Sequence, residues 1–277
     1  MIFAKKSLEN KGISVVIPNY NGETLLPQIL PPLLEELKNT GLPYEVIISD
    51  DHSTDHTVAF LKKNHPEIIL LESDNNQGFS KTINKGIFVS KYNLVLLLNS
   101  DVKLTRGYLK AQLRYFEKED TFGVMGRIIG WDDDNVQDGG KYPIMQGFKL
   151  KTSCNYLPQS INEDSWLPSF YLSGANALVS REKLLALQGF DELYSPYYVE
   201  DVDLSLRAWK MGWKCFYEHQ AVCRHQTSAT IKSKDSMKSI RTVYYRNKLY
   251  LHYIHFSGFA FFLRMIQLAP ELLLSFL

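Results

Sequence analysis

Short clusters of carboxylate and amide side chains are the residues of this chain best suited to chemistry. Asp50 and Asp51 follow one run of β-branched residues, and Asn99, Ser100 and Asp101 follow a fully apolar run. Carboxylate and amide oxygens are ligands that Mg²⁺ and Mn²⁺ prefer. A paired cation would also offset the cost of holding the Asp101 charge beside an apolar strand. For each cluster taken alone, a turn or helix-capping role is the competing interpretation.

Glu200, Asp201 and Asp203 form a second acidic cluster, at the start of a helix predicted over residues 201–211. The free N–H groups and the dipole at a helix N-terminus stabilise negative charge, so at least one of these carboxylates is expected to be ionised at neutral pH. An ionised carboxylate beside a crevice is a competent general base for a hydroxyl. Asp203 and Arg207 are four residues apart and are expected to form a structural ion pair. For Glu200 and Asp201, a capping role alone is the competing interpretation.

His225 follows a strand predicted over residues 221–223 and opens a polar segment, residues 225–228. An imidazole nitrogen is a common metal ligand, but a lone histidine is more often packed or hydrogen-bonded in the protein. Residue spacing alone leaves both interpretations open.

Alternating strand and helix patterns surround these clusters in the first hundred residues. Strands are predicted over residues 13–17, 45–49, 68–72 and 94–98, and helices over residues 24–38, 54–63 and 81–89. This alternation predicts an α/β fold with a mostly parallel central sheet flanked by helices. Ligands collect at the carboxyl ends of parallel strands, so the loops at 18–22, 50–55 and 99–101 are expected to meet in one crevice.

Two features of the sequence narrow the classes of function that the chain can have. No Gly-rich phosphate fingerprint follows the first strand, which disfavours a dinucleotide dehydrogenase or a P-loop hydrolase. A bound diphosphate would then need another source of positive charge, for which a divalent metal is the economical answer. The formal net charge is +1, from 31 Lys and Arg against 30 Asp and Glu, so a uniformly basic nucleic-acid binder is excluded and no nucleic-acid partner is expected.

Five segments carry a resemblance to a known family. In chain order they are ISVVIPNYNG (13–22), ISDDHSTDHT (48–57), NQGFSKTINKG (76–86), LLLNSDV (96–102) and GFDELYSPYYVEDVDLSLR (189–207). The set resembles family 2 glycosyltransferases, inverting enzymes with the Rossmann-like GT-A fold. It looks closest to bacterial rhamnosyltransferase-like members that build cell-surface polysaccharides of the cell envelope. The resemblance covers about residues 13–228.

The resemblance implies a nucleoside-diphosphate sugar as donor. Tyr20 and the Asp50-Asp51 pair match positions that hold the base and ribose, and Asn84 matches an amide near the ribose or diphosphate. The donor-binding residues implied in this way are Pro18, Tyr20, Asp50, Asp51, Asn84, Asn99 and Ser100.

The resemblance also implies a divalent metal, Mn²⁺ or Mg²⁺. Residues 99–101 match the family's D-x-D motif in a variant form with Asn first, so Asp101 is the retained metal carboxylate. Losing the first Asp removes one negative charge. That departure favours His225 as a further ligand, because related enzymes supply a histidine at this place.

Glu200-Asp201 matches the E-D pair that contains the catalytic base of the family, with Asp201 as the first candidate and Glu200 as the other. The implied reaction is a single displacement with inversion, in which a hydroxyl of a glycan or lipid-linked acceptor attacks the anomeric carbon. The residues expected toward the acceptor are Trp166, Asn176 and Asp191.

Two other functions stay open at this stage. The missing first Asp of the D-x-D motif slightly favours a sugar-nucleotide-binding module without transferase activity, whereas the intact Glu200-Asp201 pair and His225 argue against it. The same crevice would also suit a metal-dependent nucleotide hydrolase or nucleotidyltransferase. The products distinguish the three functions, since only a transferase releases a nucleoside diphosphate with its sugar moved to an acceptor.

The predicted organisation is a GT-A domain over residues 1–230 and a C-terminal helical tail over residues 231–277. Within the domain, residues 1–101 are expected to bind the nucleotide and residues 102–230 the acceptor. The tail is basic first and apolar later, because residues 224–248 carry a net charge of +6 and leave −5 for the rest of the chain.

The apolar segment 249–277 has a longest uncharged run of 15 residues, shorter than the ~20 needed to span a bilayer. It is therefore expected to pack on the domain, to lie on an anionic membrane surface or to join copies in a homo-oligomer. Cys154, Cys215 and Cys223 are too few for a disulfide framework, and no secretory signal precedes the first strand. We expect a cytoplasmic location, with peripheral attachment at the inner face of the cytoplasmic membrane as the option that the tail adds.

Overall fold

The computed structural model describes residues 11–156, 158, 166–226 and 237–275. Its strands are β1 (Ile13–Asn19), β2 (Tyr44–Asp50), β3 (Ile69–Glu72), β4 (Leu94–Leu98), β5 (Val102–Leu104), β6 (Thr121–Gly130), β7 (Val136–Asp138), β8 (Pro143–Gln146), β9 (Lys149–Thr152), β10 (Leu167–Pro168), β11 (Asn176–Ser180) and β12 (Lys214–His225). Its α-helices are α1 (Leu26–Asn39), α2 (Thr57–Asn64), α3 (Phe79–Val89), α4 (Tyr108–Leu113), α5 (Arg181–Ala186), α6 (Glu200–Lys210), α8 (Met237–His255) and α9 (Gly258–Ser275).

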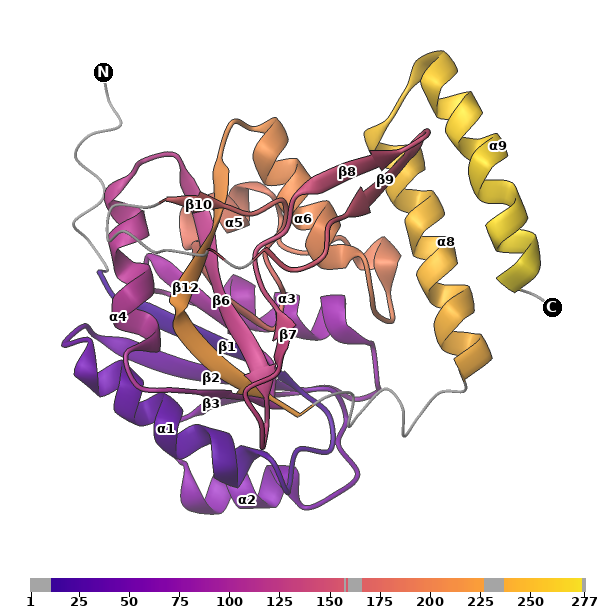
Figure 1. The fold of residues 1–277 in the computed structure, drawn as a ribbon. Coiled ribbons are helices and arrows are strands. Elements are labelled where there is room, and N and C mark those ends of the chain that lie inside the picture. Colours follow the sequence, from indigo (N-terminus) through magenta and orange to yellow (C-terminus); the bar gives the residue numbers. More distant parts are fainter. Residues whose placement is uncertain (1–10, 157, 159–165, 227–236, 276–277) are drawn as a thin grey trace.

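A mixed sheet forms the centre of the described residues (Figure 1). Its strand order is β10-β12-β6-β11-β4-β1-β2-β3, with β5 paired to β12 and β7 paired to β6. The strands from β4 to β3 run parallel to one another, and β6 and β12 form a second parallel pair. This arrangement confirms the α/β fold predicted from the alternating patterns.

Alternate residues of the central strands pack into two apolar layers, one on each face of the sheet. Val15 and Ile17 of β1 pack with Leu30 of α1, whereas Val16 packs with Ile83 of α3 on the other face. Successive side chains of a strand point to opposite faces, so an apolar run such as β1 is buried on both sides. The two layers hold the strand ends, and the loops after them, in fixed positions.

The first strand is longer than the sequence predicts. The sequence predicts a strand that ends at residue 17, before Pro18, but β1 continues to Asn19, with Pro18 opposite Ser49 of β2. The pairing of β1 with β4 ends at Val16, so the missing N–H of Pro18 falls where β1 has one neighbouring strand instead of two.

Two further predictions differ from the structure. The second helix begins at Thr57 rather than at residue 54, and its N-terminus has no side-chain cap. The Ser53 hydroxyl lies in the loop before it and bonds to Asp50. His225 is the last residue of a twelve-residue strand rather than the residue after a short one. A register shift between Glu218 and Val222 in β12 interrupts the pattern and explains why only part of this strand was predicted.

The C-terminal helices α8 and α9 lie beside the β8–β9 hairpin at one side of the molecule (Figure 1). They confirm the helical character predicted for this segment. The expected domain boundary at residue 230 lies outside the described residues. No helix in the described ranges combines the length and the apolar character that crossing a bilayer would need.

Candidate active site

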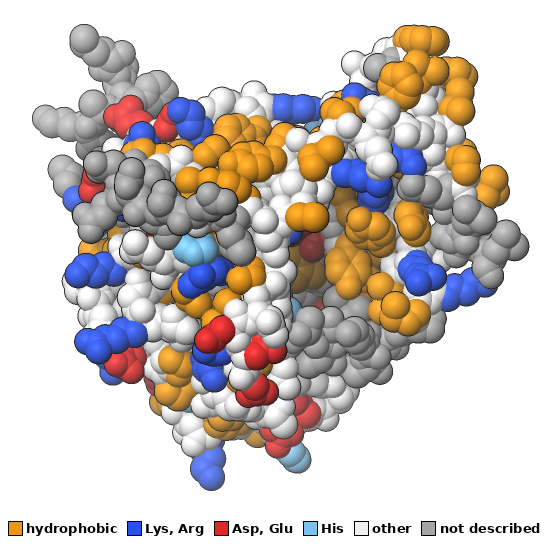
Figure 2. Space-filling model, viewed as in Figure 1, with side chains coloured by type: hydrophobic (Ala, Val, Ile, Leu, Met, Phe, Trp, Pro, Cys, Tyr) orange, Lys and Arg blue, Asp and Glu red, His pale blue; other side chains and the backbone are white. Residues whose placement is uncertain are grey.

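A cavity of about 820 Å³ lies at the carboxyl ends of β1, β2 and β4, and Figure 2 shows this face of the molecule hollowed beside α8. The loops after those strands line it, together with residues 171, 173–175, 196–198, 200 and 201 and the end of β12. The predicted site residues that line the cavity are Pro18, Tyr20, Asp51, Asn99, Ser100, Asp101, Glu200, Asp201 and His225. The three loops therefore meet in one crevice, as the strand pattern predicts.

Hydrogen bonds fix the strand-end loops against one another. The Ser53 hydroxyl accepts the N–H of Asn21 at 2.8 Å, which joins the loops after β1 and β2. Both carboxylate oxygens of Asp51 accept backbone N–H groups, from Gln77 at 2.7 Å and Gly78 at 2.9 Å. Asp51 thus fixes the loop that leads into α3, and it also lines the cavity.

Asp101, in the loop after β4, and His225, the last residue of β12, meet in the cavity lining. Asp101 Oδ2 lies 3.5 Å from His225 Nε2, and His225 Nδ1 lies 2.8 Å from Oε1 of Gln137. An amide oxygen only accepts, so Nδ1 donates to Gln137 and Nε2 is the ring nitrogen that faces Asp101. This is the ring orientation of a metal-binding histidine held by an outer partner.

The donor set fits a divalent cation. Asp101 Oδ1 and Asn99 Oδ1 are buried, and neither has a hydrogen-bond partner within the described structure. No trio of His, Cys, Asp or Glu side chains in the described ranges is arranged to hold a metal ion by itself. A cation at Asp101 and His225 would therefore need further oxygen ligands from a substrate or from water, as magnesium-type sites at phosphates do.

The Glu200-Asp201 pair occupies the first turn of α6, at the cavity wall. Burial raises the pKa of Asp201 to about 6; the N–H of Val202, which donates to Oδ1 at 2.8 Å, lowers it and the charge of Asp138 raises it. Burial and the neighbouring charge of Asp201 raise the pKa of Glu200 well above its ordinary value. Burial thus outweighs the helix dipole, and Asp201 is the member of the pair that is mostly ionised at neutral pH.

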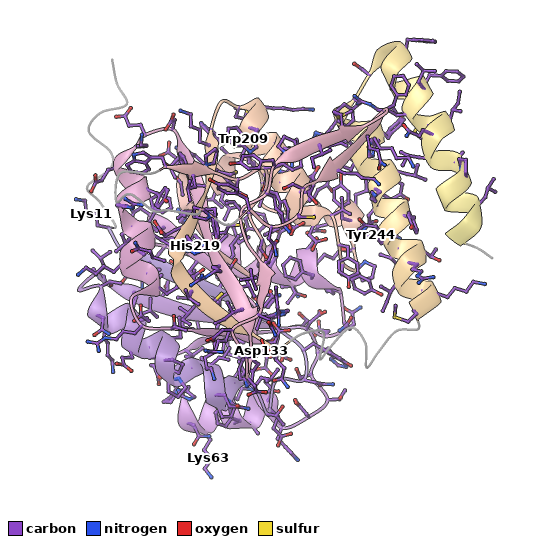
Figure 3. All side chains as sticks on the ribbon, viewed as in Figure 1. Lys11, Lys63, Asp133, Trp209, His219 and Tyr244 are labelled. Carbon is purple, nitrogen blue, oxygen red and sulfur yellow. The ribbon has the colours of Figure 1, made fainter. Side chains whose placement is uncertain are left out.

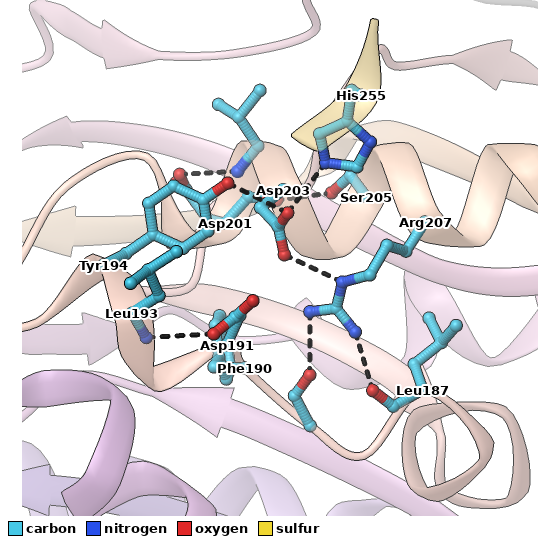
Figure 4. Close-up of polar contacts among 12 residues, drawn as sticks. Leu187, Phe190, Asp191, Leu193, Tyr194, Asp201, Asp203, Ser205, Arg207 and His255 are labelled. Atoms are coloured by element: carbon cyan, nitrogen blue, oxygen red, sulfur yellow. Dashed lines mark hydrogen bonds and ion pairs between the residues drawn. The ribbon is translucent and has the colours of Figure 1, made fainter. Parts of the chain in front are cut away.

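Asp203 has a structural role, as its spacing to Arg207 predicts. Arg207 Nε donates to Oδ2 at 2.7 Å, while His255 Nε2 and the Tyr194 hydroxyl donate to Oδ1 at 2.7 and 3.1 Å (Figure 4). Burial acts to raise the pKa of Asp203, but the hydrogen bond from His255 and the charge of Arg207 outweigh it and lower the pKa. The carboxylate joins α6 to α8.

Two residues expected at the donor do not line the cavity. Asp50 is buried beneath the strand-end loops, where its Oδ1 accepts from Asn19 Nδ2 at 2.9 Å and from Ser53. Asn84 exchanges two hydrogen bonds with the backbone of Phe190, at 2.8 and 2.9 Å. Both side chains hold loops that border the cavity, so their polar atoms are already used within the protein.

The three residues expected toward the acceptor also lie off the cavity lining. Trp166 packs edge-on against Tyr115, with ring centroids 5.0 Å apart. Asn176 is fully buried in β11 and donates to the Gly126 carbonyl at 3.1 Å. Asp191 accepts from the N–H of Leu193 and caps a 3₁₀ turn. Each has a packing or capping role in the structure and lies outside the proposed site.

Several cavity residues were missed from the sequence. Asp138 and Lys141 form an ion pair at 3.1 Å on one wall, and tyrosines from two loops line another: Tyr171, Tyr197 and Tyr198. The signal for the last two was the aromatic run directly before Glu200. Asp138 and Lys141 follow a stretch of polar residues with no strand periodicity, so the sequence offered no way to place them.

The family model for glycosyl transferase family 2 matches residues 14–186. The chain belongs to glycosyl transferase family 2. This glycosyltransferase is 28% identical over 217 residues to N-acetylglucosaminyl-diphospho-decaprenol L-rhamnosyltransferase of Mycobacterium tuberculosis, with 69% of each chain covered. It is 24% identical over 243 residues to chondroitin synthase of Pasteurella multocida, which covers 77% of this chain and 25% of that protein.

Solved structures establish the GT-A fold. GalNAc-T7, solved with UDP, GalNAc and Mn²⁺, matches with a TM-score of 0.72 at 15% identity over 89% of this chain and 48% of its own. Mannosyltransferase PcManGT of Pyrobaculum calidifontis, solved with GDP-Man and Mn²⁺, matches with a TM-score of 0.61 at 17% identity over 91% of this chain and 66% of its own. The glycosyltransferase thus spans about half the length of GalNAc-T7. Asp201 and His225 lie beyond the residues that the family model matches.

Proposed function

We propose that this glycosyltransferase moves a sugar, with inversion, from a nucleoside-diphosphate sugar to a hydroxyl of a glycan or lipid-linked acceptor in cell-surface polysaccharide synthesis. The observation that carries the proposal is the presence of Asp201 in the same cavity as Asp101 and His225. An inverting displacement needs a base on one side of the anomeric carbon and a stabilised leaving group on the other. The cavity offers one group of residues for each task.

Asp201 is the proposed base. Its pKa of about 6 leaves it mostly ionised at neutral pH and still basic enough to take a proton in the transition state. As the acceptor hydroxyl attacks, its proton goes to Asp201, a new C–O bond forms at the anomeric carbon and the bond to the diphosphate breaks. Glu200 is the weaker candidate, because burial and the neighbouring charge of Asp201 raise its pKa and so favour its protonated form.

Asp101 and His225 are the proposed metal ligands, for Mn²⁺ or Mg²⁺. When bound, the cation supplies Lewis-acid stabilisation of the negative charge on the departing diphosphate. The unpartnered oxygens of Asp101 and Asn99 and the orientation of the His225 ring support this assignment. The Mn²⁺ in the two solved structures described above supports it by fold likeness.

The remaining strand-end residues would hold the nucleotide half of the donor. Pro18, Tyr20 and Asp51 line one end of the cavity, and Asn99 and Ser100 adjoin Asp101. Holding the donor and acceptor in line makes a bimolecular reaction effectively unimolecular, which is worth up to ~7 to 11 kcal/mol. We retain the division into a nucleotide half (1–101) and an acceptor half (102–230) as part of this proposal.

A lipid-linked acceptor is supported by relatives whose names include decaprenol and undecaprenyl phosphate. The C-terminal helices offer a surface suited to such an acceptor. Phe259, Phe262, Ile266 and Leu273 are spaced by 3, 4 and 7 residues, so they form one exposed stripe on α9. Residues 237–275 contain five Lys or Arg and one acid. We propose peripheral attachment of this stripe to an anionic membrane surface.

Vesicle flotation tests the attachment. The glycosyltransferase should float with vesicles of anionic phosphatidylglycerol at low salt, and the double variant Phe262→Ser with Ile266→Ser should not. A matched control is Phe88→Ser with Val89→Ser, because these two side chains are similarly exposed on α3. Equal binding of the wild type to uncharged phosphatidylcholine vesicles, or loss in the control, would contradict the charge-assisted stripe.

A product assay tests the transferase itself. The enzyme is incubated with a panel of sugar nucleotides, Mn²⁺ and a lipid-diphosphate sugar acceptor, and products are identified by mass spectrometry. Release of nucleoside diphosphate together with a glycosylated acceptor of inverted anomeric configuration supports the proposal. Release of nucleoside monophosphate or pyrophosphate would identify a hydrolase or nucleotidyltransferase instead.

A further inference from the structure

The loop directly before Glu200 has an unusual backbone. Tyr198 and Val199 both have positive φ angles, 75° and 77°, in the left-handed region. L-residues seldom adopt this region, and for a β-branched residue such as Val199 it is a genuine outlier. Such a conformation persists only when surrounding contacts hold it in place. Because Glu200 and Asp201 follow at once, whatever holds this loop also sets the direction of the proposed base.

Side chains of helix α8 hold the loop by donating hydrogen bonds to the loop's backbone carbonyls. Asn247 is fully buried, and the two N–H groups of its Nδ2 are shared among the carbonyl oxygens of Tyr194 at 2.6 Å, Tyr197 at 3.0 Å and Tyr198 at 2.9 Å. The neighbouring Arg246 donates to the carbonyl oxygen of Ser195. A buried carbonyl left without a donor is costly, so these contacts favour one loop conformation strongly.

Every backbone carbonyl of residues 194–198 accepts a hydrogen bond. Pro196 is the one residue of 194–198 whose carbonyl is not bonded from α8, and it accepts the N–H of Phe79 at 3.0 Å. Every carbonyl from 194 to 198 therefore has a donor, and α8 bonds four of the five. Tyr244, two residues before Arg246, points from α8 toward the body of the molecule and packs edge-on to Tyr198 with centroids 6.2 Å apart (Figure 3).

A second link joins α8 to the turn that contains the base. His255, at the end of α8, donates to Asp203, two residues after Asp201. The loop before the pair and the helical turn after it are thus both attached to α8. The C-terminal helix is part of the framework of the site rather than a detachable extension.

We propose that Asn247, supported by Arg246, is a positioning residue that fixes the 194–199 loop and through it the placement of Asp201. The proposal rests on the proposed function of Asp201 as base. Asn247 does not line the cavity, so its effect on the reaction passes through the loop. A displacement of the base by about 1 Å is enough to lower a rate by ~10²-fold.

The test compares Asn247→Ala with His252→Ala. His252 is an equally buried residue of α8, but it accepts the N–H of Leu150 in the β8–β9 hairpin and does not contact the loop. Both variants lose a buried polar anchor, and both are expected to lower the melting temperature. Only Asn247→Ala should lower kcat, by ~10- to 100-fold, with the KM for donor within about threefold of the wild type.

Hydrogen exchange gives a readout that does not depend on turnover. A peptide covering residues 194–203 should exchange faster in Asn247→Ala than in the wild type and stay unchanged in His252→Ala. If Asn247→Ala does not fold, Arg246→Ala serves in its place, because Arg246 is partly exposed and bonds one carbonyl of the same loop.

The outcomes separate the two proposals. Wild-type kcat in Asn247→Ala, or equal losses of kcat in the Asn247 and His252 variants, would overturn the positioning role. Absence of sugar transfer by the wild type would overturn the proposed function, and in that case the exchange rates of residues 194–203 still decide whether Asn247 holds the loop.

Discussion

His225 Nε2 lies 3.5 Å from Asp101 Oδ2, although His225 ends β12 and Asp101 lies in the loop after β4. β4 and β12 are not neighbours: β11 and β6 lie between them in the strand order. The short strand β5, which directly follows Asp101, closes the distance, because it pairs with β12 and places Val102 opposite His225. A carboxylate and an imidazole are thereby brought together in the cavity.

The first prediction concerns this pair. Replacing Asp101 and His225 together by Ala removes both proposed protein ligands, so Mn²⁺-dependent binding of nucleoside diphosphate should be lost. Isothermal titration calorimetry with and without Mn²⁺ measures it. The matched control is Asp132→Ala with His56→Ala, a carboxylate and an imidazole that are exposed and lie outside the cavity. Titrations of the first double variant that equal those of the control would count against the metal site.

The second prediction is a pH dependence. A general base works in its deprotonated form, so kcat/KM should fall as the pH drops through about 6, the pKa to which burial raises Asp201. Above pH 7 the profile should be flat with respect to this group. Initial rates from pH 5 to 8, at saturating Mn²⁺, would show the acid limb. A profile without any acid limb above pH 5 would be inconsistent with a base of this pKa.

The third prediction concerns stability. The folded protein raises the pKa of Asp201 from about 3.8 to about 6, so it favours the protonated carboxyl. This preference stabilises the folded state fully below pH 3.8, and the stabilisation is lost as the pH rises through about 6. At pH 7.5 Asp201→Asn should therefore raise the free energy of unfolding, by about 1 to 3 kcal/mol. Urea denaturation measures the change. The exposed Asp132→Asn should leave the free energy of unfolding unchanged, and a loss of stability in Asp201→Asn would contradict the argument.

The fourth prediction concerns the network around Asp203, whose side chain is 1% exposed. Asp203→Ala leaves Arg207 and His255 without their carboxylate partner. We expect the free energy of unfolding to fall by about 2 to 4 kcal/mol. This is less than the loss for a fully buried pair, because Arg207 is partly exposed. The control is the surface pair of Lys214 and Asp120, where Lys214→Ala should cost less than about 1 kcal/mol. Equal losses in the two variants would show that burial of the pair is not what matters.

The strand-end loops could be predicted because the strands before them are short apolar runs. Once β1, β2 and β4 are parallel neighbours, their carboxyl ends must share one edge, and residues 18–22, 50–55 and 99–101 are brought together by topology alone. The Asp203–Arg207 pair could be predicted for a similar reason, since helical spacing is a local property.

Contacts between distant segments could not be predicted. Asn247 lies 53 residues along the chain from Tyr194, and nothing in the local sequence of either shows that they bond. The resemblance places Asn84 and Asn176 near the ligand, but the folded chain uses their amide groups to bond backbone at Phe190 and Gly126. A motif predicts which residues border a site, and the packing decides which atoms remain available to a ligand.

The central claim is that Asp201 is the base of an inverting sugar transfer, and Asp201→Asn tests it most directly. In a defined assay with donor, acceptor and Mn²⁺ at pH 7.5, we expect kcat to fall by about 10²- to 10⁴-fold. Affinity for the nucleoside diphosphate, measured by calorimetry, should stay within about threefold of the wild type. Transfer by Asp201→Asn at a rate close to that of the wild type would contradict the account.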